Sequence, residues 1–149
     1  MMSDLLSSHL YNNETFYKVF EKDIRRAKEF VVIESPFITM KRMDALLPII
    51  TKLRSRGVRV AINTRHPDEH DYPYSMQAEE AVRRLQELDV RVMYTVKHHR
   101  KLAIIDDEIL WEGSLNILSQ NDSCEIMRRS VSAQLANQML SFIGARRWL

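Results

Sequence analysis

The stretch from Lys97 to Asn116, KHHRKLAIIDDEILWEGSLN, decides the expected fold of this part of the chain. Two short apolar runs, within RKLAIID and ILWEGS, are joined by Asp106-Asp107-Glu108. Aspartate tolerates the left-handed backbone conformation that tight turns between strands require. The stretch therefore predicts two antiparallel strands connected as a hairpin.

Polar side chains lie at both ends of this hairpin. His99 and Lys101 are two residues apart, and so are Ser114 and Asn116. Side chains two apart on a strand project to the same face, so His99 and Lys101 share a face and His98 projects away. The hairpin brings the two pairs together, and the resulting imidazole, ammonium, hydroxyl and carboxamide suit a phosphate. One group can attack while the others donate to the non-bridging oxygens.

Two further residues are expected to support this site. Gly113 lets the backbone approach closely at the strand end. Asp106 has the opposite parity to Lys101, so we expect a structural acceptor behind the site. Each residue alone has an ordinary structural explanation, and only the joint spacing indicates chemistry.

Upstream of the hairpin, helical and strand patterns alternate. Helices are expected from about Asn12 to Glu29, from before Leu46 to Gly57, and from about Met76 to Leu88. The strands EFVVIES, VRVAINT and DVRVMYTV follow them in turn. This order predicts βαβ units and a mostly parallel sheet. In the second helix we expect Pro48 in the first turn, where its missing N–H is not needed, and Gly57 just past the end.

The two ends of the chain complete the expected organisation. EIMRRSV predicts one more strand, followed by a helix from about Ser132 to Arg146. That helix is expected to bury Leu135, Ala136, Met139, Phe142 and Ile143. Residues 1–13 are expected to be a flexible or loosely packed segment of a single domain spanning residues 1–149.

The composition is that of an ordinary globular protein. Its net charge of +2 permits an anionic partner without demanding one. The single cysteine, Cys124, excludes an intramolecular disulfide framework, fits a reducing compartment and is expected to be buried. The N-terminus lacks a signal-peptide pattern, and no apolar run reaches the ~20 residues that span a bilayer. We therefore expect a cytoplasmic protein without a membrane partner.

The segment HPDEH, from His66 to His70, matches the H-x-x-E-H pattern of some zinc proteases. In that pattern both histidines must lie one turn apart on a helix to reach one metal. Pro67 and Pro73 bracket the segment and favour a solvated loop instead. Such a loop can still rim an active site and contact substrate.

The spacing His99-x-Lys101-x4-Asp106-x6-Gly113-Ser114-x-Asn116 resembles the HKD motif of the phospholipase D superfamily. ESPF after the first strand and RGVRVAIN before the second are also similar to that family. The resemblance covers the chain from about Glu14 to the last helix. It implies an α/β/α sandwich with a central mixed, mostly parallel sheet.

The resemblance also implies roles for the motif residues. His99 would attack phosphorus and form a phosphohistidine, while Lys101 and Asn116 hold the phosphate oxygens. Ser114 would lie against the phosphate, and Asp106 would be mainly structural.

Many members of the superfamily have an acidic residue about ten positions past the asparagine, hydrogen-bonded to the histidine. Glu125 is the best match here, and Asp122 is a weaker competitor. The family often has asparagine two residues before this acid, where the present chain has Ser123.

The resemblance implies a metal-independent phosphodiesterase without a cofactor, and most directly an endonuclease acting on nucleic acid, with DNA as the expected partner. Basic residues are available to guide a phosphate backbone, namely Arg65, Lys97, Arg100, Arg128 and Arg129. Two alternatives stay open: a phospholipase or phosphatidyl transferase of the same superfamily, and a nucleic-acid-binding dimerisation module of a larger DNA-processing protein.

The superfamily uses two motif histidines, and this chain carries one HKD motif. Small single-motif members pair two chains about a two-fold axis, so that each chain supplies one histidine. We therefore expect a homodimer with the active site at or near the interface. His98 cannot replace the second histidine, because its side chain would project away from His99.

Overall fold

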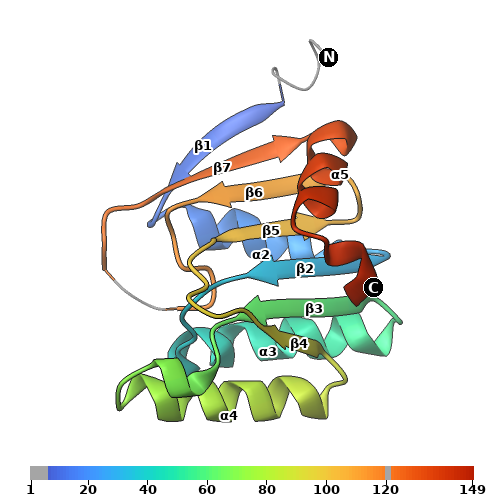
Figure 1. Cartoon of the computed structure of the whole chain (residues 1–149). Helices are drawn as coiled ribbons and strands as arrows, with labels where there is room; N and C mark the ends of the chain where they lie inside the picture. Colours follow the sequence, from blue (N-terminus) through green and yellow to red (C-terminus); the bar gives the residue numbers. More distant parts are fainter. Residues whose placement is uncertain (1–6, 120–121) are drawn as a thin grey trace.

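The computed structural model describes residues 7–119 and 122–149, in which one mixed sheet carries helices on both faces (Figure 1). The strand order within these residues is β1-β7-β6-β5-β2-β3-β4. The strands are β1 (Ser8–Asn12), β2 (Phe30–Glu34), β3 (Arg59–Thr64), β4 (Arg91–Tyr94), β5 (Leu102–Ile105), β6 (Ile109–Gly113) and β7 (Ile126–Val131). The helices are α2 (Phe16–Arg25), α3 (Met40–Ser55), α4 (Tyr74–Glu87) and α5 (Ala133–Phe142), with short 3-10 helices η1 (Pro67–Glu69) and η2 (Ala145–Trp148).

The sheet combines two kinds of strand pairing. β2, β3 and β4 pair in parallel, as the helix–strand alternation predicts. The pairs β2–β5, β5–β6, β6–β7 and β1–β7 are antiparallel. The mixed α/β sheet with flanking helices is confirmed. Parallel pairing is less extensive than expected, because β5 and β6 form a direct hairpin and β7 and β1 extend that half of the sheet by antiparallel pairing.

The hairpin turn shows why Asp106 stands where it does. Asp106 and Asp107 have φ values of 58° and 53°, the left-handed conformation that a tight hairpin turn requires. The Asp106 carboxylate accepts hydrogen bonds from the backbone N–H groups of Lys28, Glu29 and Phe30 at 2.8, 2.7 and 3.0 Å. It thereby fastens the turn to the start of β2, so the predicted structural acceptor is confirmed.

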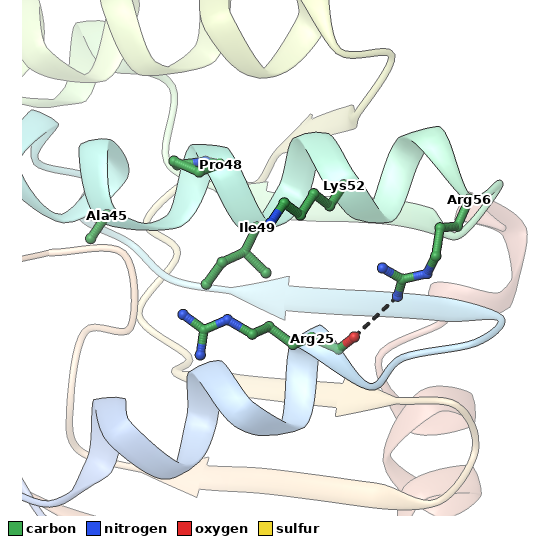
Figure 2. A pocket seen from close by; sticks show the side chains of 6 residues that line it. All are labelled: Arg25, Ala45, Pro48, Ile49, Lys52 and Arg56. Carbon is green, nitrogen blue, oxygen red and sulfur yellow. Dashed lines mark hydrogen bonds between the residues drawn. The ribbon is translucent and has the colours of Figure 1, made fainter.

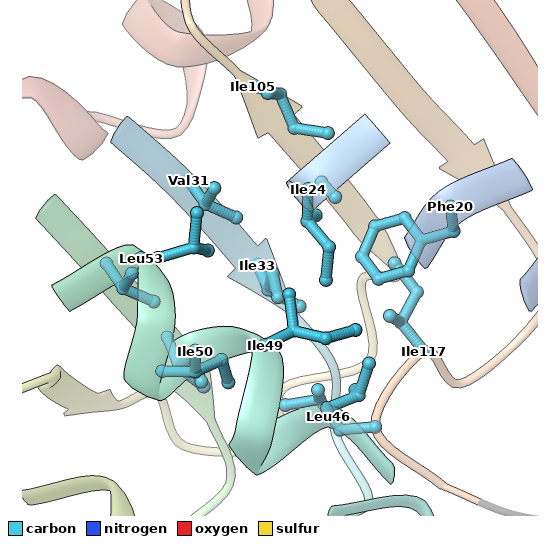
Figure 3. Packing of buried hydrophobic residues seen from close by; sticks show 14 of the residues in the cluster. Phe20, Ile24, Val31, Ile33, Leu46, Ile49, Ile50, Leu53, Ile105 and Ile117 are labelled. Carbon is cyan, nitrogen blue, oxygen red and sulfur yellow. The ribbon is translucent and has the colours of Figure 1, made fainter. Parts of the chain in front are cut away.

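The hydrophobic core lies on both faces of the sheet. On one face α3 packs its isoleucines and leucines against β2, beside Phe20 and Ile24 of α2 (Figure 3). On the other face α5 and η2 cover β5, β6 and β2. In α5 the buried positions are spaced for one helical face and include Ala136 and Leu140. Phe142 falls outside that face and is 83% exposed, so the expectation that it is buried is wrong.

Several helix boundaries differ from the sequence expectation, and α5 ends at Phe142 rather than near Arg146 because the chain turns at Gly144, with a φ of 68°, into η2. Pro48 lies in the interior of α3 rather than in its first turn, because the helix begins already at Met40. Burial of Met43 and Leu46 favours this earlier start and offsets the backbone hydrogen bond that an interior proline removes. α2 ends at Arg25 rather than near Glu29, since the backbone N–H groups of Lys28 and Glu29 bind Asp106 instead of helix carbonyls.

The sequence predicts a flexible or loosely packed segment over residues 1–13. Residues 1–6 lie outside the described part of the chain, and residues 8–12 form β1 and pair with β7 at the sheet edge. The ring of Tyr11 lies 5.2 Å from that of Trp111, which adds an apolar contact to the strand pairing. Gly57 follows α3 with a φ of 82°, as predicted for the residue past a helix end. Cys124 is exposed rather than buried.

No helix within residues 7–119 and 122–149 has the length and apolar character needed to cross a bilayer. The cytoplasmic location stays a prediction.

Candidate active site

The predicted site residues lie at the sheet edge where β2, β3 and β6 end and β5 begins, on the left of Figure 1. The end of β6 meets the start of β5 directly, because Gly113 N donates to Lys101 O at 3.4 Å. Ligand sites of α/β proteins commonly lie at the carboxyl ends of the strands. The hairpin therefore brings the two halves of the motif together as predicted.

His99 and Lys101 contact each other just before β5. The Lys101 Nζ atom lies 3.1 Å from His99 Nδ1 and donates to the backbone oxygen of His99 at 2.7 Å. His99 is exposed, whereas His98 is buried with 3% of its surface accessible. The two adjacent histidines thus point in different directions, as their parity predicts.

Ser114, Glu125 and Lys101 form the other side of the site. Hydrogen bonds from Ser114 and Ser123, together with the Lys101 charge, hold the pKa of Glu125 below its usual value. Partial burial lowers the pKa of Lys101, the Glu125 charge opposes this shift, and the Arg65 charge adds to it. The mutual effect of Lys101 and Glu125 shows that their charges lie within electrostatic reach.

Glu125 differs in its contacts from the expectation that the family resemblance implies. Ser114 and Ser123 lower its pKa, while the Nδ1 atom of His99 lies against Lys101. Glu125 N donates to Asn13 Oδ1 at 3.3 Å, which holds the start of β7 beside the segment that precedes α2. Asp122, the weaker competitor, is exposed.

Asn116 is half-buried in the turn after β6. Its Oδ1 atom is buried and has no hydrogen-bond partner among the described residues. Tyr17 fixes the following backbone by donating to the carbonyl oxygens of Ile117 at 2.6 Å and Ser119 at 3.1 Å. Burial raises the pKa of Tyr17, so its hydroxyl stays a donor.

Gly113 is required by close backbone packing. A Cβ at this position would lie 2.1 Å from Ile126 O and 2.9 Å from Met127 Cα. The predicted close approach is therefore confirmed, and the approaching backbone is that of β7. This packing lets Ser114 Oγ accept from Ile126 N at 3.0 Å and ties the motif to β7.

A buried carboxylate anchors the segment that carries His99. Glu34, at the end of β2, is fully buried and accepts from Arg100 Nε at 2.6 Å and Arg100 Nη2 at 2.9 Å. Asn63 Nδ2 donates to the same carboxylate at 2.8 Å. Glu34 Oε1 also lies 4.0 Å from His98 Nε2, and burial lowers the pKa of this histidine.

Sequence reasoning did not single out Glu34 as an anchor for the site. Its position gave one signal: Glu34 is a carboxylate at the end of an otherwise apolar strand pattern. Its partner Arg100 is among the basic residues that the sequence makes available to a phosphate backbone, and in the structure it binds Glu34 instead. Arg65 has a second anchoring contact, because its Nε donates to His98 O at 2.7 Å.

The HPDEH segment does not form the helix that a zinc protease requires. Residues 67–69 form the short 3-10 helix η1, and the side chain of His66 accepts from Asp68 N. Within residues 7–119 and 122–149, no group of three or more His, Cys, Asp or Glu side chains is placed to hold a metal ion. The segment forms a loop rather than a metal-binding helix, as predicted, and its contact with substrate stays a prediction.

A separate cavity of about 270 Å³ lies between α2 and α3 (Figure 2). The two arginines of its lining have structural partners: Arg56 donates to the carbonyl oxygens of Arg25 at 3.1 Å and Ala27 at 3.0 Å. Arg25 in turn donates to Glu21 at 3.3 Å. Basic groups at helix C-termini commonly satisfy the last carbonyls in this way. The lining contains no His, Cys, Ser or carboxylate side chain, so this cavity does not repeat the chemistry of the motif site.

A family model described as "Cardiolipin synthase, PLD-like domain" matches residues 20–145. The chain belongs to this phospholipase D-like family. Similar folds occur in Nuc from Salmonella typhimurium, a phospholipase D family member, with 18% identity, a TM-score of 0.74 and coverage of 94% of this chain and 93% of that one. NucT from Helicobacter pylori has 21% identity, a TM-score of 0.68 and coverage of 91% of both chains.

Larger proteins contain a similar fold. The phosphatidylserine synthase of Haemophilus influenzae has 14% identity and a TM-score of 0.66, with coverage of 94% of this chain and 37% of that one. No curated protein matches the sequence significantly. Membership of this family supports an enzyme that acts on phosphodiesters.

Proposed function

We propose that this protein is a metal-independent endonuclease that cleaves nucleic-acid phosphodiester bonds through a phosphohistidine at His99. The observation that carries the proposal is the contact between the exposed His99 imidazole and Lys101, beside Ser114 and Glu125. Asn116, two residues after Ser114, adds a carboxamide. This set supplies a nucleophile, a fixed positive charge and neutral donors for a phosphate.

The contact between Lys101 and His99 supports a neutral nucleophile. An ammonium group can only donate, so the proposed mechanism takes His99 Nδ1 as the acceptor from Lys101 Nζ in their 3.1 Å contact. A bound phosphate would draw the ammonium towards its non-bridging oxygens. The ring proton is then expected on Nδ1, with Glu125 as its acceptor, which frees Nε2 to attack phosphorus.

The leaving oxygen needs a proton from the opposite side of phosphorus. We propose that a two-fold homodimer supplies it, with His99 of the second chain acting first as acid and then as base towards water. Attack forms the bond between His99 nitrogen and phosphorus and releases the protonated leaving group. Water then cleaves that bond and regenerates both histidines.

Nucleic acid is preferred as substrate because cations remain available at this edge. Lys97 is exposed, and the charge of Arg65 acts on Lys101, whose pKa burial and this charge lower. Three other basic residues have partners in the fold: Arg100 binds Glu34, Arg129 binds Asp23 and Arg128 binds Ser8. One protein of similar fold, TrmBL2, is described as an archaeal chromatin protein with a novel mode of DNA binding. Its TM-score is 0.63 at 10% identity.

A phosphatidyl transferase or phospholipase is the second candidate. The family model carries the description of cardiolipin synthase, and a phosphatidylserine synthase has a similar fold. The chemistry at His99 would be the same, and only the substrate would differ.

The test is cleavage of single- and double-stranded DNA in excess EDTA, with phosphatidylglycerol vesicles assayed in parallel. DNA cleavage that survives chelation and disappears in His99→Ala supports the proposal. His9→Ala, which removes an exposed imidazole from β1, is the matched control and should cleave normally. Loss of cleavage in EDTA contradicts the metal-free mechanism, and turnover of lipid alone establishes the second candidate. DNA binding without any cleavage would indicate a binding module.

Sedimentation tests the dimer separately. A species that stays monomeric at micromolar concentration and still cleaves DNA contradicts the shared site. Mixing His99→Ala with the unaltered chain gives a second readout. Each mixed dimer holds one motif histidine, so its cleavage rate shows whether both histidines are needed.

A further inference from the structure

Three aromatic rings that the proposed reaction does not use lie at the edge that carries the site. Phe37 follows β2, His70 lies between η1 and α4, and Tyr74 begins α4. The Phe37 ring centroid is 4.9 Å from that of His70 and 6.1 Å from that of Tyr74. Phe37 and His70 are half-buried, and Tyr74 is 47% exposed. These three rings, the ring patch, form a surface contributed by separate chain segments.

Arg65 connects the ring patch to the phosphate site. Its guanidinium carbon lies 5.8 Å from the Phe37 ring centroid, and its Nε donates to His98 O. The Arg65 charge lowers the pKa of both His70 and Lys101. One cation therefore lies within electrostatic reach of both the rings and the motif lysine.

This combination matches the requirements of an unpaired nucleotide. Proteins that bind single strands place aromatic rings for base stacking next to cations for the backbone. Burial lowers the pKa of His70, so this ring is neutral at neutral pH and presents an aromatic face rather than a charge. In a duplex the bases are stacked within the helix, and their faces cannot reach such a surface.

We propose that the ring patch stacks an unpaired base of the substrate while Arg65 and Lys101 contact its backbone, so that single-stranded nucleic acid is preferred. The inference rests on the proposed phosphodiesterase function and specifies its substrate class. A membrane-inserting surface fits less well. Such surfaces commonly use one amphipathic helix with a broad apolar face, whereas these rings come from three segments around a guanidinium.

Binding is measured in a His99→Ala background, which removes the proposed nucleophile. Fluorescence anisotropy compares single-stranded and duplex DNA of about 15 nucleotides at one fixed salt concentration. Tyr74→Leu and Phe37→Leu remove an aromatic face and keep an apolar side chain. Each should weaken single-strand binding at least about fivefold and leave duplex binding nearly unchanged. Tyr74→Phe keeps the ring and should bind like the parent.

Phe142→Leu is the matched control, because Phe142 is an exposed ring on α5, across the sheet from α4. Circular dichroism confirms that each variant is folded. Equal binding of single strands by the parent and both leucine variants overturns the inference. So does a loss that appears only with anionic lipid vesicles, because the ring patch would then serve a membrane.

A small diester separates this inference from the proposed chemistry. Bis(p-nitrophenyl) phosphate has no bases, so its hydrolysis by the unaltered enzyme, and the loss of that hydrolysis in His99→Ala, tests the diester chemistry without strand recognition. If the unaltered enzyme, with His99 in place, does not hydrolyse any diester, the proposed function fails. The binding comparison then still decides whether the ring patch recognises single strands. If diester hydrolysis is intact and strand preference is absent, the inference alone fails.

Discussion

Replacing Glu34 by Gln tests whether one buried carboxylate holds the catalytic segment in place. Glu34 is fully buried and receives three hydrogen bonds, two from Arg100 and one from Asn63. Glutamine has nearly the same shape but only one acceptor oxygen. Whichever way its amide is turned, an N–H group must face Arg100 or Asn63, so at least one buried donor loses its partner.

The cost follows from the contacts. A hydrogen bond to a charged group contributes about 1.5–3 kcal/mol, and removing one member of a buried ion pair costs about 3–5 kcal/mol. Arg100 is 44% exposed and can recover hydration, which places the expected loss at the lower end. We expect Glu34→Gln to lower the free energy of unfolding by about 2–3 kcal/mol and the melting temperature by about 6–9 °C.

The assay is urea unfolding of Glu34→Gln, Arg100→Gln and the double variant. Glu79→Gln is the control, because it neutralises an exposed carboxylate on α4 and should change stability by less than about 0.5 kcal/mol. The coupling energy between Glu34 and Arg100 should exceed about 1 kcal/mol. A loss below about 0.5 kcal/mol for Glu34→Gln, or no coupling, would refute the anchoring role.

Three further outcomes are expected. Gly113→Ala should lose about 1–3 kcal/mol in urea unfolding, because its Cβ would overlap Ile126 O at 2.1 Å; an unchanged midpoint would contradict this packing. Asp106→Asn should lower the melting temperature, because one acceptor oxygen cannot serve the three backbone donors that Asp106 binds, while diester hydrolysis at low temperature should persist. Burial and the Arg65 charge lower the pKa of Lys101, so kcat/KM should fall as pH rises through a value below the ordinary 10.5, when the ammonium loses its charge. Lys101→Arg should shift that alkaline limb upward, and a limb that stays in place would assign it to another group.

The sequence predicted the local elements of the site well. Two aspartates in the hairpin turn have the left-handed conformation that their type allows, and Asp106 is the predicted structural acceptor. His99 is exposed and His98 buried, as side-chain parity indicates. These features depend on neighbours close in sequence, where residue type and spacing carry most of the information.

Several expectations failed where distant contacts decide the outcome. Pro48 lies inside α3 because burial of Met43 and Leu46 lengthens the helix at its start. Residues 8–12 form a strand because β7 offers a free edge, which a short polar segment does not reveal. Phe142 is exposed because α5 turns another face towards the sheet.

The sequence by itself determined the motif, its internal spacing and the family to which the chain belongs. Tertiary structure alone decided that Glu34, at the end of β2, and Arg65, just after β3, hold the motif segment, and that Phe37, His70 and Tyr74 meet beside it. The physical reason is the separation along the chain. Hydrogen bonds and ring contacts between residues more than 30 positions apart depend on the packing of β2, β3 and α4, which no local pattern specifies.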